Sequence, residues 1–520
     1  MRIRIFLNFY YLFFTIQLIA FAAERQLTPG VIHLDSKVSG GDYSIERLVR
    51  LAESYGQEVV IITDHDNSEA TYGIWPLENI IKKTIEQNSI KKYGAKRYIF
   101  DVKEAQKAHP DIVAMHGAEA IPFYYWQGSF WDKNLRLINF HKHILVIGLD
   151  SADDYENLPS IANGFSRRFS FTAILSLWPL AFVIFGGWLF FKGSVQKVRF
   201  GEQVFLTHSL FNRILAVVIF LIGALFLVNN FPFAQQKFDQ YHGDLGTGPY
   251  QELIDYVNSK GGLTFWAHPE VEQKVNVSSR SLRGFGTEIY TDSYQTDLLN
   301  TYNYTGFAVF EEGMKFIGKP GGIWDRVLDE YCIGAREKPA WAIGEVDFEG
   351  GGSPDEAIKH TQTFFLLKEK SEKGVLEALR SGKMYAARAI DNALFLAEFS
   401  VSNPAGNVAL MGDELDCPGR PKVRISISNS LLQRRPKPIS TEAFSQNPYL
   451  DNPETGSIQI ELIRKGEVIR TFHVDNPADI EYIDNYYRLG EKTYYRLIIR
   501  DRGLAKIVSN PIFVKFSGRQ

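Results

Sequence analysis

The chain has 520 residues, of which 45% are hydrophobic and 22% charged, and its 57 basic and 60 acidic side chains give a formal charge of −3. This length allows two to four domains with large apolar cores, which excludes a small disulfide-stapled peptide. The near-neutral balance argues against a broad nucleic-acid surface, because such surfaces carry a basic domain or stripe. Cys332 and Cys417 form no C-x-x-C pair, so we expect no thiolate metal knot or redox pair, and a single disulfide stays open.

Residues 1 to 23 have the pattern of a secretory signal. Arg2 and Arg4 precede an uncharged apolar stretch, and Ala20 and Ala22 have the small-residue spacing that a signal peptidase accepts. An uncleaved anchor is the alternative, because the apolar run is long for a signal. In both cases we expect the following chain to be exported.

Residues 24 to 165 alternate helix and strand signals. Ser44 is a suitable N-cap for the helical spacing of IERLVRLAESY, and Gly56 stands where a helix end needs a positive φ. The runs EVVIIT, DIVAMHGAEA and HILVIGLD are typical of short strands buried on both faces. Strands that alternate with helices predict a parallel sheet or barrel.

Two longer apolar runs, residues 171 to 191 and 214 to 234, carry no charge and have the length of roughly 20 residues that crosses a hydrocarbon core. They predict a transmembrane hairpin over residues 166 to 235, and the alternative is a buried hairpin in a soluble core. The basic residues that flank the runs are too evenly spread to orient the hairpin. The N-terminal signal therefore decides the orientation of the hairpin. It predicts a cell-membrane protein with a short cytoplasmic loop near 192 to 213.

With this topology, residues 24 to 165 and 236 to 520 lie on the same exported side, periplasmic or extracellular, and can pack together. Residues 236 to 390 continue the alternation through PYQELIDYVNSKGG, LTFWAHPE, PAWAIGEVDFEG and EKGVLEALRSGK. From residue 391 the period changes to two, as in KVRISIS and KTYYRLIIRD, which predicts an antiparallel β-sandwich over residues 391 to 520.

Polar residues gather where the predicted strands end. In α/β barrels such residues meet at one mouth, where active sites lie. Imidazoles and carboxylates without thiolates are the ligands of borderline and hard divalent metals. The residues concerned are His33, Asp35, Asp64, His65, Glu119, His141, His143, His268, Asp347 and Glu349.

The ordered series HLDSKVSGG, ITDHDN, HGAEA, KHILVIG, FWAHPE and GEVDFEG resembles the motifs of the polymerase and histidinol phosphatase (PHP) superfamily. The resemblance implies a distorted (β/α)7 barrel, here interrupted by the hairpin, with two or three bound metal ions. It covers residues 30 to 150 and 245 to 390. Mapped motif by motif, it assigns metal ligation to His33, Asp35, His65, Glu119, His143, His268, Asp347 and Glu349.

Three positions differ from the family pattern. Asp35 and Glu349 stand where the family usually has histidines, and the added negative charge favours harder ions over Zn²⁺. Gly40 and Gly41 occupy a turn in which some members carry a further ligand. We therefore expect a dinuclear centre of Mn²⁺, Zn²⁺ or Fe²⁺, and a third site is left open, with His65 and Glu349 as its remaining ligands.

The resemblance implies that Glu119 bridges two ions, with His33, Asp35 and Asp347 on one ion and His143 and His268 on the other. Activated water and phosphoester hydrolysis follow from such a pair. Asp64 is a candidate for orienting its ligand neighbour or for capping the strand end, and His141 is the alternative for His143. His116 is expected to pack structurally. Arg388 and Lys383 are candidate phosphate contacts.

Three functions stay open: phosphoester hydrolysis, hydrolysis of carboxyl esters, amides or carbamates by the same centre, and a catalytically silent receptor or scaffold. The segment YYRLIIRDRGLAKIVSNPIFV is similar to a secreted PHP branch that includes carbaryl-hydrolase-like metallohydrolases. We expect a phosphoester-type substrate and contact with the bilayer through two helices. The tether would suit a lipid head group, a cell-envelope polymer or a nutrient phosphodiester, and the sequence selects none of them. No nucleic-acid partner is expected.

Overall fold

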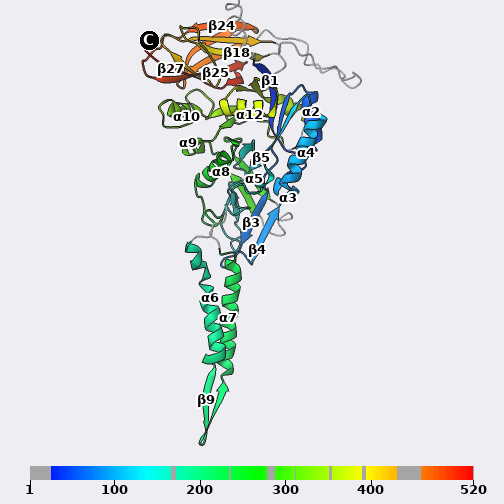
Figure 1. Ribbon diagram of the computed structural model, residues 1–520, viewed down its shortest axis with the longest axis vertical. Helices are drawn as coiled ribbons and strands as arrows, with labels where there is room; N and C mark the ends of the chain where they lie inside the picture. The colour runs from blue at the N-terminus through cyan, green and yellow to red at the C-terminus, as the bar shows by residue number, and fades with distance from the viewer. Residues whose placement is uncertain are drawn as a thin grey trace, which may run out of the picture.

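The computed structural model describes residues 25–165, 171–233, 236–277, 287–310, 312–348, 350, 354–388, 394–429 and 458–518. The predicted signal and Glu349 lie outside these ranges. Figure 1 shows a body of sheet and helices from which a long helical hairpin projects, with the C-terminal strands at the opposite end of the body.

A mixed sheet of 15 strands within the described ranges runs through the whole body. One half of it holds β15 (Trp341–Gly344), β14 (Gly306–Phe310), β11 (Leu263–Trp266), β8 (Ile144–Ile147), β5 (Val113–Ala120), β2 (Val59–Ile62) and β1 (Gln26–Leu34), in that order. The path continues through β16 (Thr361–Leu367), β17 (Met384–Arg388), β26 (Leu504–Ser509), β25 (Lys492–Asp501), β22 (Ile458–Arg464) and β23 (Glu467–Val474). β20 (Glu414–Cys417) and β27 (Ile512–Phe516) pair beside it.

Helices cover the first half of the sheet because its short strands are buried on both faces, as the apolar runs predict. The covering helices are α2 (Ile45–Ser54), α4 (Ala95–Ala108), α8 (Gly248–Ser259), α10 (Ile323–Cys332) and α12 (Glu372–Ser381). Ser44 caps α2 as expected, since its side chain accepts a hydrogen bond from the backbone N–H of Arg47.

The prediction of a parallel sheet is wrong at β16, which pairs antiparallel with β1, and at β8. This strand is antiparallel to both of its neighbours, β5 and β11. The connection from β5 to β8 contains β6 (Tyr125–Gln127) and β7 (Arg136–Ile138) but no helix. Without a crossover helix to return the chain to its starting edge, the next strand runs in the opposite direction.

The two ends of this strand series approach each other. The segment after β15 hydrogen-bonds to β1, from Val346 N to Ile32 O at 2.9 Å and from Phe348 N to His33 O at 3.3 Å. The Asp35 N–H donates back to Phe348 O at 3.0 Å. Regular closure into a seven-stranded barrel stays a prediction.

Most C-terminal strand pairs are antiparallel, as the period of two predicts, but β20 and β27 pair parallel. A second sheet holds β19 (Val408–Leu410), β18 (Phe395–Ser402), β21 (Lys422–Ser428) and β24 (Ala478–Ile483). A hydrophobic cluster separate from the main core contains residues of both sheets, among them Ile425 and Ile499. The predicted boundary at residue 390 lies outside the described residues, and β17 before it pairs antiparallel with β26 after it. Both cysteines are free.

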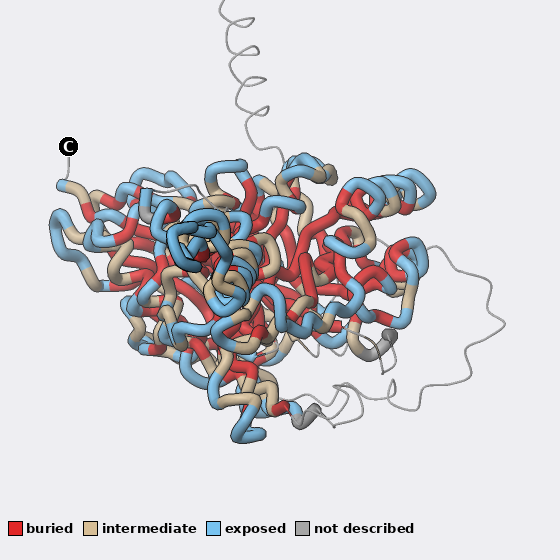
Figure 2. Tube along the Cα trace, turned by 90° about the horizontal axis from the view of Figure 1, so that it is seen from below, coloured by how far each residue is buried: buried red, intermediate tan, exposed pale blue. Residues whose placement is uncertain are grey.

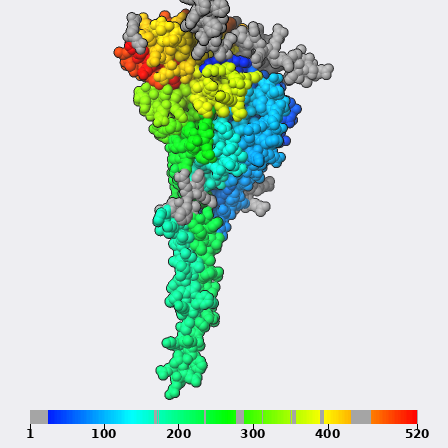
Figure 3. Space-filling view, viewed as in Figure 1, coloured from blue at the N-terminus to red at the C-terminus, as the bar shows by residue number. Residues whose placement is uncertain are grey.

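The projecting hairpin consists of η1 (Phe171–Leu177), α6 (Pro179–Trp188), η2 (Leu189–Gly193) and α7 (Leu210–Asn230) (Figures 1 and 3). Among the described residues, the helical segments Ala173–Gly193 and Leu210–Asn230 are long and apolar enough to cross a membrane. Only 11% of each is buried, so neither is a core helix of the body. Figure 2, seen along the long axis, shows buried residues concentrated in the body and mostly exposed ones in the hairpin.

Two details of the hairpin differ from the prediction. α7 starts at Leu210, four residues early, because Ser209 caps it by accepting a hydrogen bond from Asn212 N, and it ends at Asn230 before Pro232. The connection near 192 to 213 is not a simple loop. It forms a β-hairpin of β9 (Val195–Phe200) and β10 (Gln203–His208), turning at Gly201 with φ +61°.

Candidate metal centre

The predicted ligands come together at one edge of the first half of the sheet. The parallel strands β1, β2, β11 and β15 point their carboxyl ends to this edge, and β8 contributes its beginning because it runs the other way. This explains how His143, which precedes its strand, joins residues that follow theirs. The residues that meet are His33, His65, Glu119, His143, His268 and Asp347.

Glu119 on β5 is the centre of the group. Its Oε2 lies 2.9 Å from His65 Nδ1 and 3.3 Å from His33 Nε2. Its Oε1 lies 3.3 Å from His268 Nε2 and contacts His143 Nδ1. Among the described residues, two imidazoles therefore face each carboxylate oxygen. Such an arrangement suits a carboxylate that bridges two cations.

Two sets of three side chains have ligand atoms within 4.8 Å of one another and could each hold a metal ion. One set is His65, Glu119 and His143, and the other is His33, Glu119 and Asp347. Within the described part of the chain, His33 Nε2, Asp35 Oδ2 and Glu119 Oε2 are buried and have no hydrogen bond. Buried polar atoms are nearly always hydrogen-bonded, so these atoms fit a bound cation.

The backbone is strained at three of these residues. His33, His268 and Asp347 have φ values of +75°, +28° and +49°, in a region that L-residues rarely adopt. At His33 the pairing between β1 and β2 also shifts register. Such conformations cost on the order of 1–3 kcal/mol each and cluster at functional sites. The strain at this edge of the sheet therefore indicates a functional site.

The pocket favours positive charge next to Glu119. Burial alone would lower the pKa of His33, but Glu119 and Asp347 outweigh burial and hold that pKa well above its usual value. The same competition between burial and the nearby carboxylates raises the pKa of His268 to about 9. Burial would raise the pKa of Glu119, yet the surrounding imidazoles lower it well below its usual range. For His143, burial wins and lowers the pKa.

Two supporting residues were missed from the sequence. Glu345 Oε2 lies 3.1 Å from His33 Nδ1, and its Oε1 accepts a hydrogen bond from the His268 N–H at 2.6 Å. The Tyr294 hydroxyl lies 3.2 Å from His268 Nδ1 and donates to Ala267 O at 2.5 Å. The sequence held a signal for Glu345, because a carboxylate directly follows the apolar run AWAIG. It held no signal for Tyr294.

Asp35 follows β1 and Asp64 follows β2, and both contact the loop after β1. Asp64 accepts hydrogen bonds from the backbone N–H groups of Ser36 and Ser39, at 2.8 and 3.0 Å, and from both hydroxyls. Asp35 Oδ1 accepts from the Ser39 hydroxyl at 2.8 Å. These contacts give Asp64 the role of a strand-end anchor. A side chain at Gly41 would put its Cβ 2.0 Å from Asp35 O, so position 41 has no room for a further ligand, whereas a Cβ at Gly40 would meet no atom within 4 Å.

The other candidates lie around this centre. His141 is half-buried, and its ring centroid lies 5.8 Å from that of His143. Burial, followed by repulsion from neighbouring imidazoles, lowers the pKa of His141 to about 3. The Arg388 guanidinium lies 5.3 Å from the ring centroid of Phe310, the last residue of β14, at the same edge of the sheet.

Two other residues take structural places. Lys383, at the far end of β17 from Arg388, pairs with Asp413, which argues against a phosphate contact. His116 lies 2.8 Å from the Tyr155 hydroxyl in the interior, as expected.

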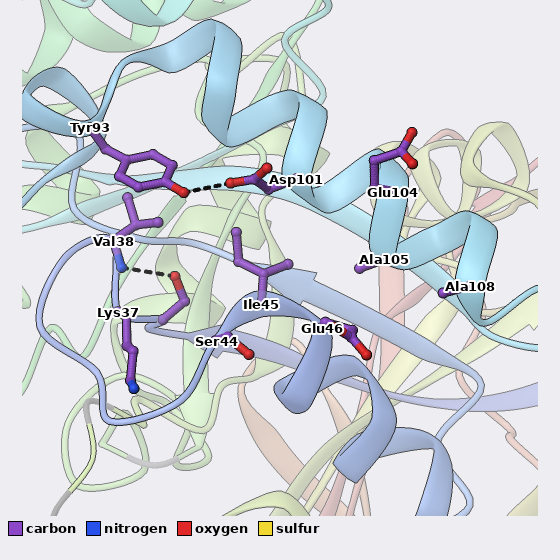
Figure 4. A pocket seen from close by; sticks show the side chains of 11 residues that line it. Lys37, Val38, Ser44, Ile45, Glu46, Tyr93, Asp101, Glu104, Ala105 and Ala108 are labelled. Atoms are coloured by element: carbon purple, nitrogen blue, oxygen red, sulfur yellow. Dashed lines mark hydrogen bonds between the residues drawn. The ribbon is translucent and has the colours of Figure 1, made fainter.

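A separate cleft lies between α2 and α4, on the outer side of the loop that carries Asp35. Figure 4 shows Ser44 and Glu46 on one wall and Tyr93 bonded to Asp101 on the other. None of the residues that line it belongs to the group around Glu119. The cleft is therefore separate from the group around Glu119.

No family model and no curated protein matches the sequence. Solved structures that are similar include a two-domain protein of Bacteroides vulgatus ATCC 8482 containing a predicted PHP-like metal-dependent phosphoesterase, with 10% identity, a TM-score of 0.34, and coverage of 94% of this chain and 95% of that one.

A proposed metal-dependent phosphoesterase of Bifidobacterium adolescentis ATCC 15703 has 17% identity and a TM-score of 0.27, over 64% of this chain and 91% of that one. An amidohydrolase of Chromobacterium violaceum has 12% identity and a TM-score of 0.24, over 62% and 89%. The similar structures thus include one with a predicted PHP-like metal-dependent phosphoesterase. At these values the activity has to be argued from the site itself.

Proposed function

We propose that this chain is a membrane-tethered, exported, metal-dependent hydrolase of the PHP type, and that its reaction is phosphoester hydrolysis. The observation that carries the proposal is the convergence on Glu119 of four imidazoles and Asp347, in the described part of the chain, with strained backbone and buried atoms that lack hydrogen bonds. In this reading residues 24–165 and 236–390 form one interrupted barrel, and residues 391–520 form a β-sandwich.

The two sets of side chains described above offer one division between two ions. His33 and Asp347 would hold one ion with Glu119, and His65 and His143 the other, with His268 also on the Oε1 side of Glu119. Asp35 would complete the first set through its Oδ2. Divalent ions held in this way supply a Lewis acid that activates water and stabilises charge on phosphoryl oxygens.

The protein's own residues determine how a substrate would enter. The Asp347 side chain is 35% exposed whereas Glu119 and His33 are buried, so the pocket opens on the Asp347 side. Arg388, at the end of β17 on the same edge, is positioned for a substrate phosphate. Glu345 and Tyr294 hold His33 and His268 with their second ring nitrogens occupied, which directs the first toward Glu119.

The test is metal analysis of protein purified without chelators, followed by assays on chromogenic phosphomonoesters, phosphodiesters, carboxyl esters and carbamates with Mn²⁺, Fe²⁺ or Zn²⁺ added back. We expect close to two ions per chain and turnover of a phosphoester. Turnover of carbon esters or carbamates alone would replace the phosphoester assignment with the carbonyl one. Fewer than one ion per chain would support a silent scaffold instead.

The tether has a test of its own. We expect a periplasmic-type reporter fused after residue 520 to be active, and the same reporter inserted at Gly201 in the β9–β10 turn to be silent. The apolar surfaces of the two projecting helices support this arrangement. Activity at Gly201 and silence after residue 520 would reverse the topology.

A further inference from the structure

An apolar tip projects from the body beside the base of the hairpin. β3 (Glu69–Gly73) and β4 (Lys82–Glu86) form an antiparallel pair whose connecting segment exposes Trp75, Ile80 and Ile81 by 80%, 39% and 48%. A single exposed apolar residue is ordinary, but three large ones in one eight-residue turn form a contact surface. Figure 1 shows this pair running from the body toward α6 and α7.

The tip is fixed to the last turn of α7 by three hydrogen bonds. The Asn79 N–H donates to Asn229 Oδ1 at 3.1 Å, and Asn79 Nδ2 donates to Asn229 O at 2.8 Å. Asn229 Nδ2 in turn donates to Pro76 O at 3.3 Å. The tip therefore has a set position along the helical hairpin.

That position coincides with the edge of the bilayer if the hairpin spans it. The 21 residues of α7 have a length of about 32 Å at ~1.5 Å per residue, close to the ~30 Å of a hydrocarbon core. Asn229, in its last turn at the body end, then lies at the exported interface. Tryptophan is enriched at this depth, and the exposed Lys82 and Lys83 that follow the tip suit lipid phosphates.

We propose that residues 74–81 are a second membrane contact, with Trp75, Ile80 and Ile81 seated in the headgroup layer of the outer leaflet. The proposal rests on the membrane-tethered function above and adds a fixed orientation of the body. Trp75 lies ten residues after His65, so the metal centre is at most about 35 Å from the lipid surface. Substrates held at the membrane surface thus lie within about 35 Å of the metal centre.

The test uses the full chain in phospholipid nanodiscs, with Cys332→Ser and Cys417→Ser and one new cysteine carrying a small fluorophore. The three positions are Trp75→Cys in the tip, Ile222→Cys in the middle of α7, and Leu504→Cys in an exposed turn at the far end of the body. The quenchers are lipids with a nitroxide on the headgroup or deep in the acyl chain, and aqueous iodide.

We expect headgroup nitroxide to quench position 75, deep nitroxide to quench position 222, and only iodide to quench position 504. Loss of lipid quenching at 222 would overturn the tether itself. Lipid quenching at 222 without any at 75 would overturn the contact alone, and shielding of 75 from iodide in that case would identify a protein neighbour instead. If the cysteine changes disturb folding, the quenching difference between wild type and Trp75→Phe gives the same answer.

Discussion

This protein buries charge in two places, at the Arg496–Asp325 pair and around Glu119, and the two clusters neutralise that charge differently. Arg496 on β25 and Asp325 on α10 are both about 1% exposed or less, and they join the C-terminal strands to the helical part of the body. Arg496 Nε and Nη2 donate to the two Asp325 oxygens at 2.7 and 2.6 Å. The Tyr494 hydroxyl donates to Asp325 at 2.9 Å, and the guanidinium lies 4.8 Å from the ring centroid of Trp324. The two charges cancel within the protein.

The cluster around Glu119 is not closed in this way. Its imidazoles crowd one carboxylate, buried atoms of His33, Asp35 and Glu119 have no hydrogen bond among the described residues, and part of the backbone is strained. Arg496 Nη1 is also buried without a hydrogen bond, but the Arg496 charge lies against the opposite charge of Asp325, whereas around Glu119 several imidazoles share one carboxylate and the backbone of three residues is strained. The difference indicates that one cluster holds the fold together and that the other was built to receive cations.

The largest expected effect separates the two roles completely. Glu119→Gln should reduce hydrolysis to background and metal content to a small fraction, because an amide cannot bridge two cations. We expect the unfolding temperature of the metal-free protein to fall below wild type near pH 6.5, where Glu119 stabilises the protonated His268, and to approach wild type as the pH rises to about 9. Metal analysis, turnover and calorimetry measure the three quantities. Unchanged turnover would remove Glu119 from the centre.

The converse substitution is Arg496→Met. It leaves Asp325 buried without its partner, which should cost roughly 3–5 kcal/mol of unfolding free energy. Turnover and metal content of the folded protein should not change. The control is Arg496→Met combined with Asp325→Leu, which removes both charges and should restore most of the lost stability, as denaturant unfolding would measure. A destabilised double variant would show that the pair itself is needed.

The pH dependence of stability distinguishes an open cluster from a closed one. The folded-state pKa of His268, about 9, is raised above the ordinary 6.5. Its stabilising contribution is therefore complete below pH 6.5 and is lost as the pH rises to about 9, a difference of roughly 3 kcal/mol. Metal binding requires neutral imidazoles, so the metal-loaded protein should keep its stability over this window.

The measurement is thermal unfolding of metal-free and metal-loaded protein between pH 6.5 and 9. The gap between the two unfolding temperatures should widen with pH. Parallel curves would mean that the imidazoles do not exchange protons for cations.

The order of the motifs predicted the centre because strand ends converge, and this held even for His143, whose strand runs backwards. The strand direction itself could not be predicted, since the periodicity of HILVIG is the same in both directions. Glu345 and Tyr294 were missed because their partners lie 77 and 26 residues away from them, at the backbone and ring of His268. The β9–β10 hairpin was not predicted, because hydropathy indicated only a loop between two apolar runs. Gly201 was the residue that indicated its turn.

The smallest expected effect tests whether Glu345, which contacts His33 and His268, contributes to metal affinity. Glu345 accepts from His268 and contacts His33, and in Glu345→Gln one of these two acceptor oxygens becomes an N–H₂ group. We expect metal affinity to fall about 10- to 100-fold, as for other residues that orient metal-binding histidines. Titration calorimetry with Mn²⁺ measures the affinity, and Glu481→Gln, at an exposed ion pair with Lys422, is the matched control.

Because Glu345 is fully buried, a purely structural role would lower the unfolding temperature of the metal-free protein without changing the metal affinity of the fraction that folds. A loss of affinity at unchanged metal-free stability would instead show that the open cluster, unlike the Arg496 pair, is held in shape for its cations.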